Sequence, residues 1–408
     1  MRELPVTILG FGMMGTARAV AYEAVMRYYG NTPIKPVLYQ AYTYTDAEAA
    51  GAAATGWEAT KDLDAAITNP KTEYVDVCLP NSMHCDAVLK ALAAGKHVFC
   101  EKPLSVTVEE AHKMVDAAAA KPELLNSVNF IYRRVPANVY ARKLVKDAVF
   151  GKLLEARSFY NQAWGGPDTD YSWRFSNTGG TLGDLGSHAL DMLYYTTGMR
   201  PIELCAMQSV HIPYRYKPAT VGSDLEGRYN KKATDLAEVW ADWRKDAEAA
   251  ANGGETSRPM VKVDTDDVTR IMYTLPGGAV GSLECTRNAW GTENTHGYEL
   301  YFERGAIRWN YDDMNYLGIY DASKPERGWA RVCCNRGGFA YPSFADGHMF
   351  GYRDLLVNAC YENMLKIAGQ PEVAPVASFQ DALDVERTIE AVRKSWSEKR
   401  WVKLDEIA

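Results

Sequence analysis

A glycine motif near the start of the chain constrains its fold more than any other feature. Gly10-Phe11-Gly12-Met13-Met14-Gly15 has the form G-x-G-x-x-G, follows the apolar run Val6 to Leu9 and opens a helical pattern. In this strand–turn–helix setting the first glycine permits a tight turn, the second lets backbone approach a pyrophosphate, and the third lets helix and strand pack closely. The motif therefore predicts a dinucleotide-binding Rossmann domain with the pyrophosphate at a helix N-terminus. The alternative is a glycine-rich turn in some other α/β protein.

Apolar runs and helical patterns alternate through the first 130 residues. Short continuous apolar runs are typical of parallel strands that are buried on both faces. Strands are expected at 6–9, 37–42, 74–79, 97–100 and 124–129, and helices at 15–29, 46–54, up to about 94, and 108–120. The order predicts a doubly wound parallel α/β sheet over residues 1–130.

Residues 131–408 follow a different pattern, which predicts an α+β domain for substrate binding and oligomerisation, with a large antiparallel sheet. Its expected elements are a helix at 137–148, strands at 153–160, 268–275, 280–286 and 298–302, a turn at 276–278, a helix at 379–394 and a strand at 401–404. The polar segment 211–260 interrupts this pattern. It is expected to be an insertion with a helix at 236–251, ended by Gly253 and Gly254.

Charge and cysteine content exclude several classes of protein. A net charge of −7 argues against a nucleic-acid binder, because phosphate binding needs a positive footprint. The N-terminus does not have the pattern of a signal peptide, and no run approaches the roughly 18 apolar residues of a membrane helix. None of the eight cysteines forms a CxxC pair, so no metal site is expected. The expected location is the cytoplasm.

The end of the second expected strand bears on the choice of dinucleotide. NAD-specific sites usually place an acid there, on the ribose, but this chain has Thr43, and Asp46 comes slightly late. No lysine or arginine occurs between Lys35 and Lys61 to pair with a 2′-phosphate. The sequence therefore favours NAD as the cofactor and leaves NADP as the alternative.

Three further motifs carry a family resemblance. They are Pro80-Asn81-Ser82-Met83-His84, Glu101-Lys102-Pro103 and the segment GGTLGDLGSHALD from Gly179 to Asp191. The chain resembles the Gfo/Idh/MocA oxidoreductases in these motifs and in SFQDALDVERTIEAVRKS, so the likeness spans nearly everything except 211–260. The motifs and the resemblance together predict these cofactor-binding residues: Gly10, Phe11, Gly12, Met13, Met14, Gly15, Thr43, Leu79, Pro80, Asn81, His84, Glu101, Lys102, Trp173 and Arg174.

The resemblance also implies a catalytic set of Lys102, Asp184 and His188. Oxidising a secondary alcohol needs a base for the hydroxyl proton and a polar group that steadies the developing oxyanion. His188 suits the base, and Asp184 lies four residues earlier, on the same face if a helix begins there. Lys102 follows a parallel strand, at the edge where open α/β sheets bind ligands. Taken singly, they could be a core histidine, a solvated lysine and a helix cap, and Asp191 could orient His188.

Within the family, several segments most resemble levoglucosan dehydrogenases and related glycoside oxidoreductases. These segments are YSWRF from Tyr171, TRNAWG from Thr286, YRR from Tyr132 and QAW from Gln162. Sugars are held by hydroxyl hydrogen bonds and by aromatic faces against ring C–H groups. The expected substrate contacts are Lys102, Tyr132, Gln162, Trp164, Asp184, His188, Asn288 and His296.

The resemblance therefore predicts an NAD(P)-dependent dehydrogenase that oxidises a secondary ring hydroxyl, such as that on C3, of a sugar, glycoside or cyclitol. One alternative is a glycosidase or lyase of the same fold, in which NAD oxidises C3 transiently and elimination cleaves the glycosidic bond. A second is a non-catalytic sensor that binds a dinucleotide. Family members commonly associate through an open sheet face, so a homo-oligomer is expected.

Overall fold

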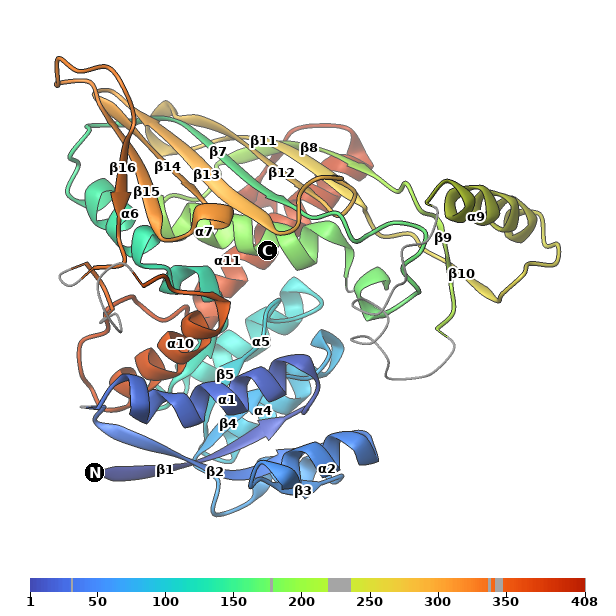
Figure 1. Ribbon diagram of the computed structural model, residues 1–408, viewed down its shortest axis with the longest axis vertical. Helices are drawn as coiled ribbons and strands as arrows, with labels where there is room; N and C mark the ends of the chain where they lie inside the picture. Colours follow the sequence, from blue (N-terminus) through green and yellow to red (C-terminus); the bar gives the residue numbers. More distant parts are fainter. Residues whose placement is uncertain (31, 177–178, 219–235, 337–338, 342–347, 408) are drawn as a thin grey trace.

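Two β-sheets organise the computed structural model, which describes residues 1–30, 32–176, 179–218, 236–336, 339–341 and 348–407 (Figure 1). The N-terminal sheet has six strands, and the C-terminal sheet has nine. This arrangement confirms the predicted fold class, a Rossmann α/β half followed by an α+β half with a large sheet. Of the predicted insertion, residues 219–235 lie outside the described residues.

All strands of the N-terminal sheet are parallel, in the order β3-β2-β1-β4-β5-β6. The strands are β1 (Arg2–Leu9), β2 (Ile34–Tyr42), β3 (Glu58–Thr60), β4 (Tyr74–Val77), β5 (His97–Cys100) and β6 (Asn126–Val128). The helices are α1 (Met13–Tyr28), α2 (Asp46–Ala54), α3 (Leu63–Thr68), α4 (His84–Ala93) and α5 (Val108–Ala119). Sequence patterning missed β3, because this three-residue edge strand has two exposed side chains and no apolar run.

The C-terminal sheet has the order β16-β15-β14-β13-β7-β12-β11-β8-β17. Its strands are β7 (Leu153–Asn161), β8 (Glu203–Ser209), β11 (Val268–Thr274), β12 (Val280–Thr286), β13 (Thr295–Phe302), β14 (Gly305–Asn310), β15 (Tyr316–Asp321), β16 (Ala330–Cys333) and β17 (Val402–Lys403). Neighbouring strands are antiparallel except β7 and β12, which are parallel. After β7 the chain crosses through the helix at Ser187–Thr197 and re-enters the sheet at β8. Because β8 pairs antiparallel with β11, and β11 pairs antiparallel with β12, strand β12 has the direction of β8 and lies parallel to β7.

One face of the nine-stranded sheet is covered, and the other is open (Figure 1). Helices α6 (Pro136–Lys146), α7 (Ser187–Thr197) and α11 (Phe379–Glu398) pack against the covered face. Alternation along β7 buries Ala156, Ser158 and Tyr160 on that side. The open face carries Met207, Met272 and Val280, with 55%, 57% and 51% of their surfaces exposed.

An arm extends to one side of the sheet (Figure 1). It contains an antiparallel pair, β9 (Tyr214–Tyr216) with β10 (Met260–Lys262), and helix α9 (Leu236–Ala251), as the pattern at 236–251 predicted. Ile212, Trp243 and Ala247 form its small separate core. The fully buried Arg215 fixes the arm's base, donating to the carbonyl oxygens of Gly165, Gly166 and Thr169.

Helix α10 (Tyr352–Ile367) joins the end of the chain to the Rossmann half by packing on α1. The rings of Tyr29 and Tyr361 stack with centroids 3.8 Å apart, and the Tyr28 hydroxyl donates to Asp354 at 2.7 Å. The sequence pattern missed α10, because it is buried on nearly all sides, and its buried Asn358, Glu362 and Asn363 interrupt any amphipathic repeat. Among the described residues, no helix is long and apolar enough to cross a membrane.

Candidate active site

The glycine motif forms a turn between β1 and α1 that leaves no room for side chains at two of its positions. A Cβ on Gly10 would lie 2.7 Å from the Cys78 carbonyl oxygen, and one on Gly15 would lie 2.0 Å from the Gly10 oxygen. Gly10 also has φ of +94°, which favours glycine. These two glycines are therefore explained by the packing of the chain itself.

At Gly12, by contrast, no clash within the described residues explains why the residue is a glycine. The nearest atom to a Cβ placed on it is Glu48 Oε1, at 3.7 Å, an ordinary contact distance. Gly12 is the N-cap of α1 and is exposed, and it has no side chain to satisfy the first amides of the helix. Free amides and space above a helix N-terminus fit a dinucleotide pyrophosphate. Phe11, by contrast, is buried against Trp57, so only its backbone faces this cradle.

The strand β5 ends in a loop that is fixed by a buried ion pair. Arg18 Nη2 donates to Glu101 Oε1 at 2.6 Å, and Asn129 Nδ2 donates to the same oxygen at 2.7 Å. The Arg18 guanidinium is fully buried and lies 3.9 Å from the centre of the Phe99 ring. Glu101, predicted to bind cofactor, is therefore occupied in holding the loop that presents Lys102.

His84, also predicted at the cofactor, links the same loop to its neighbour. Its Nδ1 lies 3.0 Å from the Pro103 carbonyl oxygen, and its Nε2 lies 2.9 Å from the Leu79 carbonyl oxygen. Burial lowers the pKa of His84. With both ring nitrogens on backbone oxygens, this side chain ties the loops after β4 and β5 together.

Lys102 meets Asp184 across the two halves of the molecule. Its Nζ donates to Asp184 Oδ1 at 2.8 Å and to the Asp184 carbonyl oxygen at 2.7 Å. Asp184 lies in a π-turn, Leu182–Gly186, directly before α7. Its other oxygen, Oδ2, accepts from the fully buried Arg287 Nη2 at 3.0 Å and lies 3.9 Å from Arg174 Nε.

The charge around Asp184 decides its protonation state. Burial alone would raise the pKa of this carboxyl, but Lys102, Arg287 and Arg174 outweigh burial and hold the pKa well below its usual range. Asp184 therefore remains a carboxylate at neutral pH. It can anchor Lys102 and a substrate hydroxyl, and it is a poor acceptor for a proton.

His188 lies in the first turn of α7, buried against aromatic rings. The centre of its ring is 4.9 Å from that of Tyr132 and 5.9 Å from that of Tyr160. Burial lowers the pKa of His188 well below its usual value, and the positive charge of Lys102 lowers it further. The ring is therefore neutral at pH 7, as a general base must be. Within the described part of the chain its Nδ1 has no hydrogen-bond partner.

Tyr132 begins a chain of hydrogen bonds along the wall of the site. Its hydroxyl lies 2.7 Å from the Tyr160 hydroxyl, which in turn donates to Asn294 Oδ1 at 2.8 Å. Gln162 Nε2 donates to the same Asn294 oxygen at 2.5 Å, and the Trp164 indole donates to Gln162. The structure thus joins three predicted substrate contacts, Tyr132, Gln162 and Trp164, through two residues that sequence analysis missed.

His296 lies behind this wall, on the covered face of the sheet. Its ring stacks on Tyr160 with centroids 4.7 Å apart, and burial lowers its pKa to about 4. Nδ1 faces the Phe159 carbonyl oxygen at 2.9 Å and so carries the proton, which leaves Nε2 as an acceptor. Among the described residues, Nε2 has no partner.

The remaining predicted residues are dispersed. Arg174 lies over the Trp173 ring at 4.5 Å and borders Asp184. With its amide oriented so that the nitrogen faces the acceptors, Asn288 donates to the Gly165 carbonyl oxygen at 3.1 Å and to the Arg287 carbonyl oxygen at 3.2 Å, so it braces a loop. Thr43 is fully buried, with its hydroxyl 3.4 Å from the Thr60 carbonyl oxygen.

Other predicted cofactor residues differ in exposure. Met13 is exposed and Met14 is half-buried, both in the first turn of α1, whereas Leu79 and Asn81 are buried on either side of the exposed Pro80. Asp191 does not orient His188, because both of its oxygens accept from Arg133 Nε at 3.0 Å.

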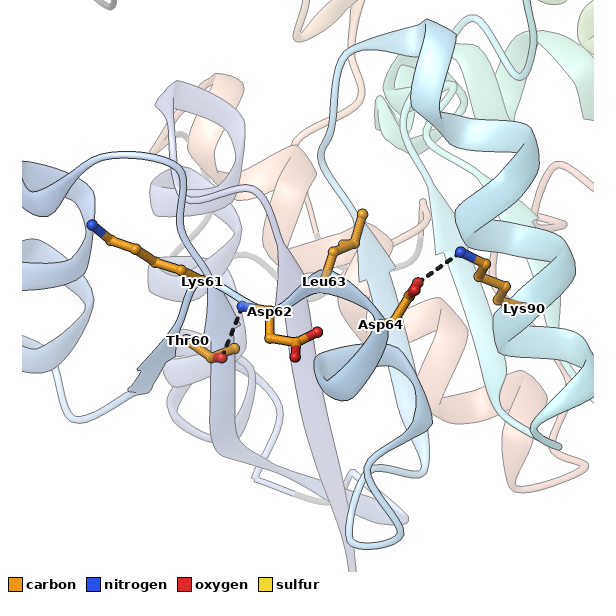
Figure 2. Close-up of a pocket in the computed structure, with 6 residues that line it drawn as sticks. All are labelled: Thr60, Lys61, Asp62, Leu63, Asp64 and Lys90. Carbon is orange, nitrogen blue, oxygen red and sulfur yellow. Dashed lines mark hydrogen bonds and ion pairs between the residues drawn. The ribbon is translucent and has the colours of Figure 1, made fainter.

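Two surface depressions lie outside the catalytic cluster. One, of about 770 Å³, is lined by Thr60, Lys61, Asp62, Leu63, Asp64 and Lys90 at the carboxyl edge of the parallel sheet (Figure 2). The other, of about 530 Å³, includes Tyr311, whose ring centre lies 5.5 Å from that of Tyr132. The second depression therefore adjoins the aromatic wall of the site.

The contrast between the glycines gives a paired prediction. Gly12→Ala should leave the fold intact but weaken NAD binding by about tenfold or more, because charge-assisted hydrogen bonds to the pyrophosphate are worth roughly 1.5–3 kcal/mol. Gly15→Ala should lower the free energy of unfolding by about 1–3 kcal/mol or more, because its Cβ meets backbone. Calorimetric titration and chemical denaturation measure the two effects. Unchanged NAD affinity in Gly12→Ala would contradict this account of the cradle.

Comparison with known proteins identifies the family of the chain. A family model described as an oxidoreductase family with an NAD-binding Rossmann fold matches residues 4–130. A model of the GFO/IDH/MocA C-terminal domain matches residues 139–308. Together the two models cover most of the chain, including Lys102, Asp184 and His188.

Individual relatives match over different lengths. The chain is 32% identical to levoglucosan dehydrogenase of Pseudarthrobacter phenanthrenivorans over 421 residues, 100% of both chains. It is 33% identical to D-glucoside 3-dehydrogenase of Escherichia coli over 147 residues, 35% of this chain and 40% of that protein. A levoglucosan dehydrogenase solved with NADH and L-sorbose superposes with a TM-score of 0.83 and 29% identity over 99% of both chains. The chain therefore belongs to the Gfo/Idh/MocA family and is an NAD(P)-dependent oxidoreductase of CH–OH groups, with NAD as the cofactor of its Rossmann domain.

Proposed function

We propose that this enzyme oxidises a secondary ring hydroxyl, such as that on C3, of an uncharged sugar, glycoside or cyclitol. The observation that carries the proposal is the neutral, buried His188 beside the Lys102–Asp184 ion pair. A base that is unprotonated at pH 7 and a fixed cation are the two groups that alcohol oxidation requires.

Each catalytic side chain has a distinct role in this proposal. His188 takes the hydroxyl proton on a ring nitrogen. Lys102 donates a hydrogen bond to the substrate oxygen as negative charge develops there. Asp184 holds the Lys102 ammonium in place and stays ionised. Bound NAD supplies the acceptor for the hydride that leaves the carbinol carbon.

The wall of the site supports a carbohydrate substrate. Gln162 and Trp164 are partly exposed and place an amide and an aromatic ring side by side, the mixture that hydroxyls and ring C–H surfaces require, while the buried Tyr132 packs on His188. The acceptor His296 Nε2 adds a buried group without a partner in the described residues. The similarity to a levoglucosan dehydrogenase and to a D-glucoside 3-dehydrogenase supports the same class of substrate.

The experiment is NAD reduction by the purified protein, followed at the nicotinamide absorbance, with glucose, levoglucosan, aryl glucosides and inositols. Lys102→Met and His188→Asn should each lower kcat/KM by about 10²–10⁴, the usual contribution of a positioned acid–base group. Lys90→Met, which removes a partly exposed lysine that pairs with Asp64 at the depression in Figure 2, is the matched control and should retain activity.

The alternatives give different results in the same assay. Glycoside cleavage without net NADH formation would replace this proposal with transient oxidation followed by elimination. NAD binding without turnover of any of these substrates would favour a sensor.

The lowered pKa of His188 predicts the pH dependence. Activity needs the neutral ring, which persists below the ordinary histidine pKa of 6.5 because burial and Lys102 disfavour the imidazolium. The value of kcat/KM should therefore stay level as the pH falls to 6.5 and decline only at lower pH. An acid limb centred at or above pH 6.5 would show that His188 is not the base.

We also propose that the open face of the nine-stranded sheet joins copies of the chain. Exposed Met207, Met272 and Val280 lie on adjacent strands there, and contiguous apolar surface favours association. Light scattering should report an oligomer in solution, and Met272→Lys should shift it toward monomer. A monomeric wild-type protein refutes this proposal.

A further inference from the structure

The Rossmann half lacks an acid at the place where NAD-binding domains usually carry one. Strand β2 ends at Tyr42, and the next residue, Thr43, is fully buried. The Thr43 amide and hydroxyl both face the Thr60 carbonyl oxygen, at 2.9 and 3.4 Å. Thr43 is therefore committed to joining the ends of β2 and β3, and another residue must hold the adenosine ribose.

Glu48 brings a carboxylate to the glycine cradle from the first turn of α2. Its Oε2 accepts from the backbone amides of Tyr44 at 2.7 Å and Thr45 at 3.2 Å, as half of a capping box with Thr45. These two bonds fix the carboxylate while using one of its oxygens. The other oxygen, Oε1, lies 3.7 Å from the position of a Cβ on Gly12 and accepts no hydrogen bond from the described residues.

We propose that Glu48 is the residue that binds the adenosine ribose and selects NAD over NADP. The second glycine is where backbone approaches the pyrophosphate, and the ribose is bonded directly to that group. A carboxylate held beside Gly12 accepts hydrogen bonds from ribose hydroxyls and repels a 2′-phosphate. Glu48 thus takes the place, in space, of the acid that is absent from the end of β2. The inference concerns cofactor affinity and does not depend on the sugar substrate.

Lys61 is the nearby residue whose charge would favour the opposite cofactor preference, NADP over NAD. Lys61 pairs with Asp46 at the start of α2, and both side chains are largely exposed. Figure 2 shows Lys61 pointing away from Asp64 and Lys90. If Lys61 rather than Glu48 governs the site, it would hold the 2′-phosphate and favour NADP. The affinities for NAD and NADP of variants at Glu48 and at Lys61 separate these two possibilities.

The test is calorimetric titration of the full-length protein with NAD and with NADP, without substrate. Glu48→Gln removes the charge but keeps an oxygen for the capping box. It should weaken NAD binding by about tenfold or more and reduce the NAD-over-NADP ratio by at least as much. Glu48→Asp keeps the negative charge but moves it away from Gly12. The affinity for NAD should therefore fall, while NADP should remain the more weakly bound cofactor. The matched control is Glu23→Gln, an exposed site about 16 Å along α1 from Gly12, which should leave both affinities within about threefold.

Two results would overturn the assignment. The first is a Glu48→Gln protein that melts like wild type and keeps the wild-type NAD-over-NADP ratio. The second is a wild-type protein that binds NADP more tightly and loses that preference in Lys61→Gln.

Discussion

The ion pair between Lys102 and Asp184 is the interaction on which the site depends. Lys102 belongs to the loop after β5 in the Rossmann half, and Asp184 belongs to the π-turn before α7 under the nine-stranded sheet. Their contact at 2.8 Å therefore connects the half that carries the cofactor with the half that carries His188, the proposed base. Buried ion pairs repay their desolvation only when further hydrogen bonds complete them, and here Arg287 and the Asp184 carbonyl oxygen do so.

The same cluster fixes the protonation of His188. Both α7 and the π-turn belong to one helical segment, so the lysine that binds Asp184 also lies within electrostatic reach of the histidine. Its positive charge adds to burial in lowering the pKa of His188, while Asp184 opposes it more weakly. Supports outside the cluster keep this geometry in place. Arg18 and Asn129 hold Glu101, and His84 links the loops after β4 and β5.

Patterns local in sequence were predictable, and contacts between distant segments were not. The strand at 97–100 and the helix at 46–54 agree residue for residue, because buried parallel strands read as apolar runs and α2 has a capping box. The motifs also located Lys102, Asp184 and His188, whose catalytic roles remain predictions. Arg287 could not be found in this way, since it lies 103 residues from Asp184. Glu48 was missed for a related reason: its proximity to Gly12 arises from the fold and leaves no pattern in the sequence.

The charges around Asp184 suit the transfer of a proton from a substrate hydroxyl to His188, the proposed base. Three cationic side chains, Lys102, Arg287 and Arg174, surround a single carboxylate in a buried site. Arg287 also donates to the Gly180 and Arg174 carbonyl oxygens, so its guanidinium is held by backbone, whereas Lys102 is the member of this trio whose charge acts on His188, the proposed base. A surplus of positive charge that is fixed before the reaction stabilises an oxygen that becomes negative, and costs no reorganisation when the charge appears. It also disfavours a proton on His188 before substrate binds. If His188 is the base, as proposed, the charges that keep its ring unprotonated are also the ones that stabilise the alkoxide formed when it takes the substrate proton.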